Sequence, residues 1–160
     1  PVGHAQQVGV FSWVKQITAG SRKASARGSS VAKVKAMEGE SVTLDARPTR
    51  ADQTYLYRSD IESALLSVFD ADSTTRSTPV YVEELVVDNV MEVAPVIDAG
   101  WREDGVGRTF QYVLPAGVLI EGGRTYGIEL VLRTKTDGPR STKWEVETIP
   151  LKTSRAHLGV

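Results

Sequence analysis

The sequence predicts an all-β protein, an antiparallel sandwich of two sheets, and three observations support this prediction. Apolar and polar residues alternate through several short segments, as in strands with one buried and one solvated face. Clusters of Gly, Pro, Asp and Ser separate these segments. No segment of the 160 residues carries a convincing long helical pattern. We therefore expect about six or seven short strands between residues 38 and 151.

The clearest feature is a predicted hairpin near the end of the chain, over residues 123–147. Every second residue over 126–132 is apolar, which gives this segment one oily face. A polar break with Gly and Pro follows at 137–139, and Trp144 and Val146 then resume the alternation. Two antiparallel strands joined by a short turn explain this pattern.

Two strands are expected earlier in the chain, with a loop between them. Residues 38–47 hold apolar residues at every second position from 42 to 46, after a Gly turn. Residues 47–60 have the composition of a loop. Residues 61–72 match both helical and strand spacing, and the Asp-, Ser- and Thr-rich segment that follows favours a strand.

The middle of the chain supplies the remaining strands. Residues 79–88 are β-rich, and Pro79 stands at their start, where a missing N–H is least harmful. Residues 89–108 form a long connection with room for one short strand, and residues 109–115 alternate again before Pro115 ends them. We therefore expect an immunoglobulin-like (Ig-like) arrangement of two packed sheets for residues 38–151, followed by a C-terminal tail over 152–160.

Residues 1–37 differ from the rest of the chain in charge. They carry six basic residues and no acidic residue, whereas residues 38–160 carry thirteen basic and twenty acidic residues. Residues 19–30 are small, basic and rich in Gly and Ser, and such a composition cannot build a core of its own. We expect residues 1–37 to be an extended basic arm that becomes ordered only against a partner.

The arm is the first candidate binding element, because its apolar side chains are costly to leave in water. The candidate contact residues are Phe11, Trp13, Val14, Lys15, Arg22, Lys23, Arg27, Lys33 and Lys35. A solvated tail and non-specific contacts with nucleic-acid phosphates stay open as alternatives.

The residues give no pattern of catalysis or metal binding. The chain has no cysteine, which excludes thiolate catalysis and Cys-based zinc sites. His4 and His157 lie near opposite ends of the chain, without the neighbours that a triad or zinc site needs. Residues 70–74 begin like a calcium loop but lack its Gly and Glu, so turn hydrogen bonds are the simpler interpretation. We expect no enzymatic activity, no cofactor and no metal.

Glu83 and Glu84 form an adjacent acidic pair. Neighbouring residues of a strand point to opposite faces, so these two carboxylates cannot share an acid–base site. We expect both to lie on a solvated sheet surface. The chain also lacks a run of about 18 apolar residues and the apolar core of a secretory signal, so we expect a protein made in the cytoplasm without a membrane span.

Several segments resemble one family when they are taken in order. The matching residues are Asp60, Ile61, Ser63, Val68, Phe69, Asp70, Thr78, Pro79, Val80, Phe110, Tyr112, Leu114, Pro115, Ala116, Tyr126, Ile128 and Glu129. In this order they resemble the small Ig-like β-sandwich accessory proteins of tailed bacteriophages and prophages. The resemblance covers residues 38–151 and leaves the basic arm unmatched.

The resemblance implies a non-enzymatic virion protein. It would be a capsid decoration (cement) protein whose arm docks on neighbouring subunits, or else a neck or tail accessory protein. The implied partners are the major capsid protein or other virion proteins, and the implied location is the virion. A homo-oligomer is compatible with this role, whereas partners such as nucleic acid or a membrane are not expected.

A carbohydrate- or receptor-binding module is the alternative from a different functional class. Such modules present aromatic side chains on a loop or an exposed face, and Tyr55, Tyr57 and Trp101 are the candidates here. The same three residues could instead cap the core.

Overall fold

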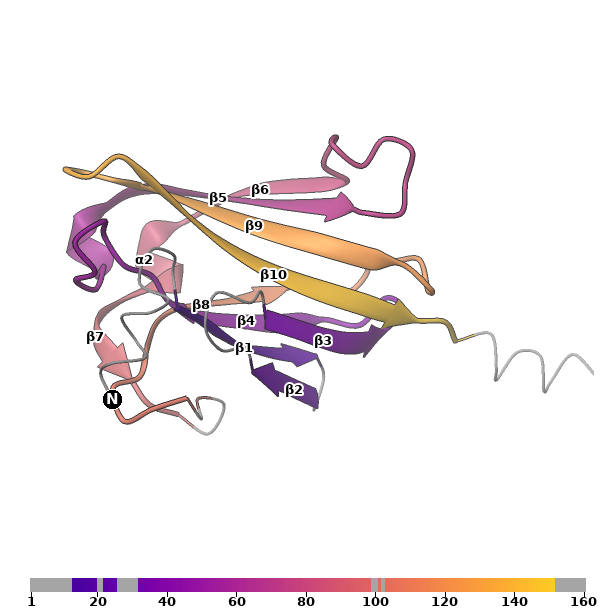
Figure 1. Cartoon of the computed structure of the whole chain (residues 1–160), viewed down its shortest axis with the longest axis horizontal. Helices are drawn as coiled ribbons and strands as arrows, with labels where there is room; N and C mark the ends of the chain where they lie inside the picture. The colour runs from indigo at the N-terminus through magenta and orange to yellow at the C-terminus, as the bar shows by residue number, and fades with distance from the viewer. Residues whose placement is uncertain (1–12, 20–21, 26–31, 99–100, 102, 152–160) are drawn as a thin grey trace, which may run out of the picture.

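The computed structural model describes residues 13–19, 22–25, 32–98, 101 and 103–151, and these form ten strands in two sheets. The strands of the first sheet are β1 (Trp13–Ala19), β2 (Arg22–Ser25), β4 (Val42–Arg47), β7 (Met91–Val96) and β8 (Arg108–Leu114). Those of the second sheet are β3 (Ala32–Met37), β5 (Ile61–Asp70), β6 (Tyr81–Leu85), β9 (Thr125–Thr134) and β10 (Pro139–Ile149). The two sheets pack against each other (Figure 1), so the all-β prediction is confirmed.

The order of the strands is β2-β1-β4-β8-β7 in the first sheet and β3-β10-β9-β5-β6 in the second. Neighbours in the described part of the chain pair antiparallel, except that β3 runs parallel to β10. Two short helices interrupt the strands: η1 (Arg58–Asp60), a 3₁₀ turn, and α2 (Val87–Val90).

The predicted hairpin is confirmed as β9 and β10. Its register places Ile128 opposite Trp144 and Tyr126 opposite Val146, so the apolar faces of both strands coincide. The turn between them contains Gly138, whose φ of 71° lies in the left-handed region that glycine adopts without a steric penalty.

The remaining expected strands also form, with one change. Residues 61–70 are a strand, β5, so the helical alternative for this segment is wrong. The predicted strand over 79–88 ends at Leu85, and α2 follows it. This short helix carries the chain from the second sheet to the first, and its Val90 is buried between them.

The prediction of an extended arm is wrong for residues 32–37, which form β3 inside the second sheet. Ala32, Val34 and Ala36 alternate with two lysines, and all three face the core. The lysines turn outward and pair with the neighbouring strand: Lys33 Nζ lies 3.4 Å from Glu145 Oε1, and Lys35 Nζ lies 3.7 Å from Glu147 Oε1. Its two lysines and its short apolar side chains explain why the sequence analysis assigned this strand to the basic arm.

Other parts of the expected arm also join the sheets. β1 pairs with β4 and with β2, so Trp13, Val14, Lys15, Arg22 and Lys23 lie on strands of the first sheet. The expectation of an arm that becomes ordered only against a partner is therefore wrong for residues 13–19 and 22–25 as well. Phe11, Arg27 and the predicted tail over 152–160 lie outside the described residues.

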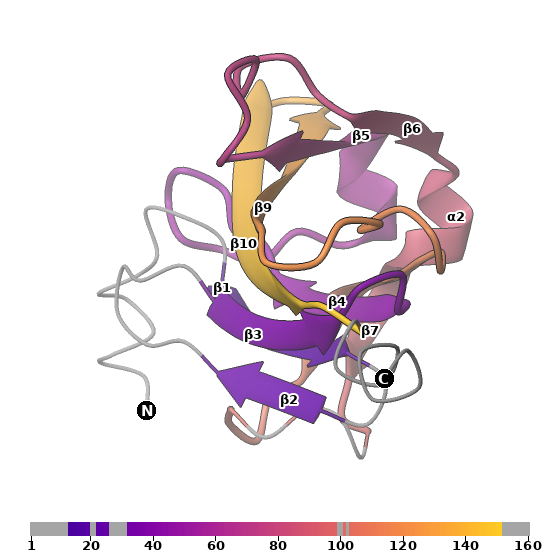
Figure 2. The same ribbon diagram turned by 90° about the vertical axis from the view of Figure 1, so that its right-hand side faces the viewer.

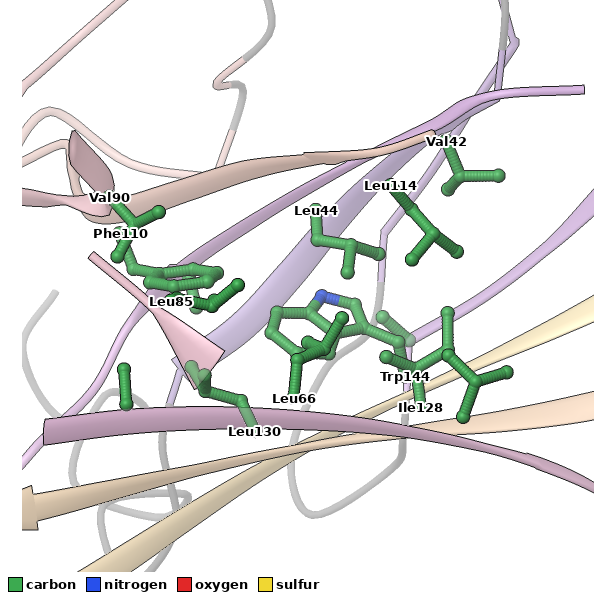
Figure 3. Packing of buried hydrophobic residues seen from close by; sticks show 14 of the residues in the cluster. Val42, Leu44, Leu66, Leu85, Val90, Phe110, Leu114, Ile128, Leu130 and Trp144 are labelled. Carbon is green, nitrogen blue, oxygen red and sulfur yellow. The ribbon is translucent and has the colours of Figure 1, made fainter. Parts of the chain in front are cut away.

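The core between the sheets is centred on Trp144, which is 1% exposed. Its ring packs against Phe110 of the opposite sheet, with ring centroids 5.9 Å apart, and Leu44 and Leu66 lie close by (Figure 3). The indole N–H donates to the Asp45 carbonyl across the sheets, at 3.4 Å. Aromatic burial combined with a satisfied N–H makes this contact a strong tie between the two layers.

The two sides of the sandwich are closed differently. On one side, β3 contacts β1 and β2 in addition to its partner β10. On the other side, α2 contacts β5, β7 and β8 (Figure 2). The N-terminal strands therefore complete one side of the sandwich.

The burial of β3 can be tested by placing the same residue at two adjacent positions. Ala36→Gln introduces a polar side chain at a fully buried position, and we expect it to lower the free energy of unfolding by about 3 kcal/mol. Lys35→Gln changes an exposed residue and should cost less than about 0.5 kcal/mol. Urea unfolding of both variants measures the difference, and equal effects would contradict the assignment of β3 to the core.

Candidate functional site

The segment between β4 and η1 folds into a tight hairpin-like loop. The Arg50 N–H donates to the Thr54 carbonyl at 2.8 Å, and the Gln53 N–H donates to the Arg50 carbonyl at 2.9 Å. Gln53 has a φ of 72°, an uncommon conformation for a residue other than glycine. Leu56 is fully buried and anchors the loop to the core.

Hydrogen bonds fix this loop against the turn between β9 and β10. The Ala51 N–H donates to Asp137 Oδ2 at 2.8 Å, and the Arg140 Nε–H donates to the Thr49 carbonyl at 3.1 Å. The Lys135 N–H donates to the Asp60 carbonyl at 3.0 Å. The loop is therefore held at one end of the sandwich by residues from distant parts of the sequence.

A groove of about 520 Å³ lies along this loop. Its lining residues are Arg50, Gln53, Thr54, Tyr55, Tyr57, Ser59 and Asp60. Arg50 Nη2 lies 2.5 Å from Asp60 Oδ1, and both side chains are mostly buried. The groove thus combines two aromatic side chains with a neutralised ion pair and several uncharged polar groups.

A buried arginine supports the groove from behind. Arg47 is fully buried, and the carbon of its guanidinium lies 4.6 Å from the centroid of the Tyr55 ring and 5.7 Å from that of Trp101. Its two terminal nitrogens donate to the two carboxylate oxygens of Asp104, at 2.9 and 2.7 Å. Such a bidentate pair has a strict geometry and holds the guanidinium plane in place.

The carboxylate of Asp104 serves as a hydrogen-bond acceptor for its surroundings. Burial alone would raise the pKa of Asp104, but the hydrogen bonds from Arg47 and from the Val106 N–H outweigh it and hold this pKa well below its ordinary value. The Trp101 indole N–H also donates to Asp104, at 3.2 Å. This carboxylate is a structural anion and a poor proton acceptor near neutral pH.

The three predicted recognition aromatics have different positions. Tyr55 and Tyr57 are half-buried, and both line the groove. Trp101 is 4% exposed and packs on Arg47, so it is wrong as a surface recognition residue and caps the structure instead. The sequence analysis missed Arg47 and Asp104, because residues 57 positions apart carry no local signal of their contact.

A second polar cluster joins the two sheets beside β6. Glu83 Oε1 on β6 accepts hydrogen bonds from the hydroxyls of Tyr81 and Tyr112. Tyr112 lies on β8 of the opposite sheet, and its hydroxyl oxygen is 2.5 Å from Glu83 Oε1. The bonds from Tyr112 and then Tyr81 lower the pKa of Glu83. Burial, followed by the hydrogen bond to Glu83, raises the pKa of Tyr112.

The predicted opposite orientation of the two adjacent glutamates is confirmed, since Glu84 is exposed while Glu83 faces inward. The expectation that both are solvated is wrong for Glu83. Its strand lies at the border of the second sheet, where an inward side chain can reach the phenol hydroxyls of both layers.

Asp70 and Asp72 act as turn residues, as the sequence indicates. Asp70 Oδ1 accepts a hydrogen bond from the Asp72 N–H, and Asp72 Oδ2 accepts one from the Thr125 N–H. Asp70 also pairs with Arg124 at 2.9 Å. Within the described ranges, no three His, Cys, Asp or Glu side chains come together as a metal site would require, and no helix has the length and apolarity to cross a membrane.

The Arg47–Asp104 pair can be tested with an isosteric variant. Asp104→Asn leaves the buried guanidinium without its counter-charge, and we expect the free energy of unfolding to fall by about 3 kcal/mol. Asp88→Asn, at an exposed position of α2, is the matched control and should change it by less than about 0.5 kcal/mol. Equal stabilities in urea at neutral pH would contradict the supporting role of this pair.

The Glu83 cluster should make stability depend on acidity. Because the folded-state pKa of Glu83 is lowered, its stabilisation is present above the ordinary value of 4.5 and is lost as the pH falls through the folded value. At pH 7, we expect Glu83→Gln to lower the free energy of unfolding by about 1 kcal/mol. This difference from the wild type should shrink towards zero as the pH falls.

Glu84→Gln is the control, because it removes an equal charge from an exposed neighbour. Thermal unfolding of the wild type and both variants between pH 7 and pH 3 measures the effect. If the stability difference between the wild type and Glu83→Gln stays constant with pH, the assigned role of this carboxylate is contradicted.

Compared with known proteins, the chain matches no family model, no curated protein and no solved structure. We therefore infer its function from its own residues and geometry.

Proposed function

We propose that the protein is a non-enzymatic structural component of a tailed-phage particle, a capsid decoration protein of Ig-like architecture that binds the shell protein. The order of motifs over residues 38–151 supports this proposal through its resemblance to phage accessory proteins. The two packed β-sheets agree with the sandwich that this resemblance implies. In this proposal, the contact surface lies on the second sheet and not on an N-terminal arm.

The observation that carries the proposal is the exposed border of that sheet at β6. No strand of the described part of the chain pairs with the outer side of β6. Val82 of β6 is 51% exposed, and Val80 and Val86, directly before and after the strand, are 54% and 61% exposed. Leu65 of the adjacent β5, 41% exposed, extends this apolar surface.

An edge strand of this kind favours binding to another protein. Its unpaired N–H and C=O groups can continue the sheet into a strand of a partner. Polar or charged side chains usually prevent this, whereas Glu84 is flanked by the exposed Val82 of β6 and by the exposed Val86 directly after the strand. A partner strand would therefore gain backbone hydrogen bonds and apolar burial together.

A small interface along one strand suits a particle that is built from many copies of the same subunit. Each copy needs to contribute only a few contacts, because the symmetry of the shell repeats them and adds avidity. The polar clusters support the non-enzymatic proposal, since the carboxylates of Asp104 and Glu83 are both occupied by structural hydrogen bonds.

The proposal is tested on particles released from the source strain after prophage induction. Mass spectrometry of gradient-purified particles should find this chain in fixed proportion to the shell protein. A copy number equal to that of the shell protein supports decoration, and a much lower fixed number overturns decoration in favour of a neck or tail position. Absence from all particles, while the chain is expressed, would overturn the proposed virion role.

The contact surface is tested by adding purified variants to particles from a strain that lacks the gene. Val82→Lys places a charge on the outward face of β6 and should weaken binding by at least about tenfold. Val113→Lys, on β8 of the opposite sheet, is the matched control, because Val113 has a similar exposure of 53%. Equal binding of both variants would exclude β6 as the docking edge.

A further inference from the structure

We infer that the groove along the loop between β4 and η1 binds a neutral saccharide, with Tyr55 and Tyr57 as the stacking residues. Saccharide binding belongs to a different functional class from shell binding, and this inference does not depend on the proposed role in a particle.

The charges in the groove favour an uncharged ligand. Arg50 and Asp60 neutralise each other at 2.5 Å, and both have further partners. Arg50 Nη1 also donates to Thr54 Oγ1 at 3.0 Å and to the Tyr55 carbonyl at 3.1 Å, while Asp60 Oδ2 accepts the Tyr57 N–H at 2.8 Å. An anion would meet Asp60 and a cation would meet Arg50, so neither gains a net attraction from this wall.

The aromatic wall is rigid. One face of the Tyr55 ring rests on the Arg47 guanidinium, which Asp104 holds by two hydrogen bonds. Arg47 is fully buried, so the ring has a fixed support instead of solvent behind it. A saccharide presents flat C–H faces that pack on aromatic rings, and a ring that is already fixed loses little entropy when a ligand binds.

Uncharged polar groups lie beside these rings. The Gln53 amide and the Ser59 hydroxyl line the same groove, and so does Thr54, whose hydroxyl already bonds Asp52 and Arg50. Tyr55 and Tyr57 belong to the same lining, and a phenol hydroxyl can both donate and accept a hydrogen bond. Both donors and acceptors are therefore presented beside an apolar face, which fits a polyhydroxylated ligand better than an apolar one.

The conformation and size of the groove agree with a small ligand. Gln53 keeps a φ of 72° although glycine would adopt it more readily, and such conformations concentrate at ligand sites. The volume of about 520 Å³ lies within the range of about 300–1,000 Å³ that small-molecule sites occupy.

The inference is tested by titrating the isotope-labelled full chain with saccharides and following its backbone amide signals by NMR. The probes are glucose, galactose, mannose and N-acetylglucosamine, each also as a short oligomer, with sialic acid and inorganic phosphate as charged comparators. We expect at least one neutral probe to shift the amides of residues 50–60 in a saturable manner, and the charged comparators to shift them less.

Two variants assign the binding to the groove. Tyr57→Ala should weaken it by at least about tenfold, because it removes a stacking ring. Gln53→Gly should weaken it about threefold or more through loss of the amide, and it keeps the loop folded because glycine favours the observed φ. Ser77→Gly, at an exposed position of the loop between β5 and β6, is the control and should bind like the wild type.

Three results would overturn the inference. The first is that no neutral probe shifts these amides at millimolar concentration. The second is stronger binding of phosphate or sialic acid than of any neutral probe. The third is that shell protein, and no saccharide, shifts the amides of residues 50–60, which would make the groove a protein-docking surface.

Discussion

The packing of Trp144 between the two sheets is the contact on which the rest of the structure depends. It brings β10 against β8 through Phe110, and its indole N–H reaches the backbone of β4 at Asp45. Once these strands are fixed, their outward residues have fixed positions too. Arg47 is the last residue of β4 and is itself buried, and Arg140 of β10 donates a hydrogen bond to the carbonyl of Thr49. The loop that forms the groove is therefore positioned by the core beneath it.

Charged side chains act mainly as structural ties in the described part of the protein. Arg47 with Asp104 supports the groove, Arg124 with Asp70 joins two loops, and Glu83 links two tyrosines across the sheets. The lysines of β3 pair with glutamates of β10 in the same way. Two lysines of the basic N-terminal segment thus belong to the pairing of β3 with β10, because each of them faces a glutamate on the adjacent strand.

The two proposed binding surfaces use different properties of the sandwich. The border at β6 offers unpaired backbone and apolar side chains, which suit an extended protein partner. The groove offers fixed rings and neutral polar groups, which suit a small hydroxylated ligand. Both surfaces lie outside the core, and the same core supports both, as is usual for sites on sandwich folds.

The sequence by itself determined the β class and the hairpin of β9 and β10, because alternation with a period of two is a local signal. For β5 the alternation was ambiguous, and the polar turn residues after it indicated the strand. It also pointed to Tyr55 and Tyr57, since aromatic residues in a polar loop stand out. Only the tertiary structure decided that residues 32–37 belong to the core, that Trp101 is buried and that Glu83 faces two phenols. The physical reason is that burial and hydrogen bonding depend on residues far away in the chain, as between Arg47 and Asp104, and these meet only when the sheets pack.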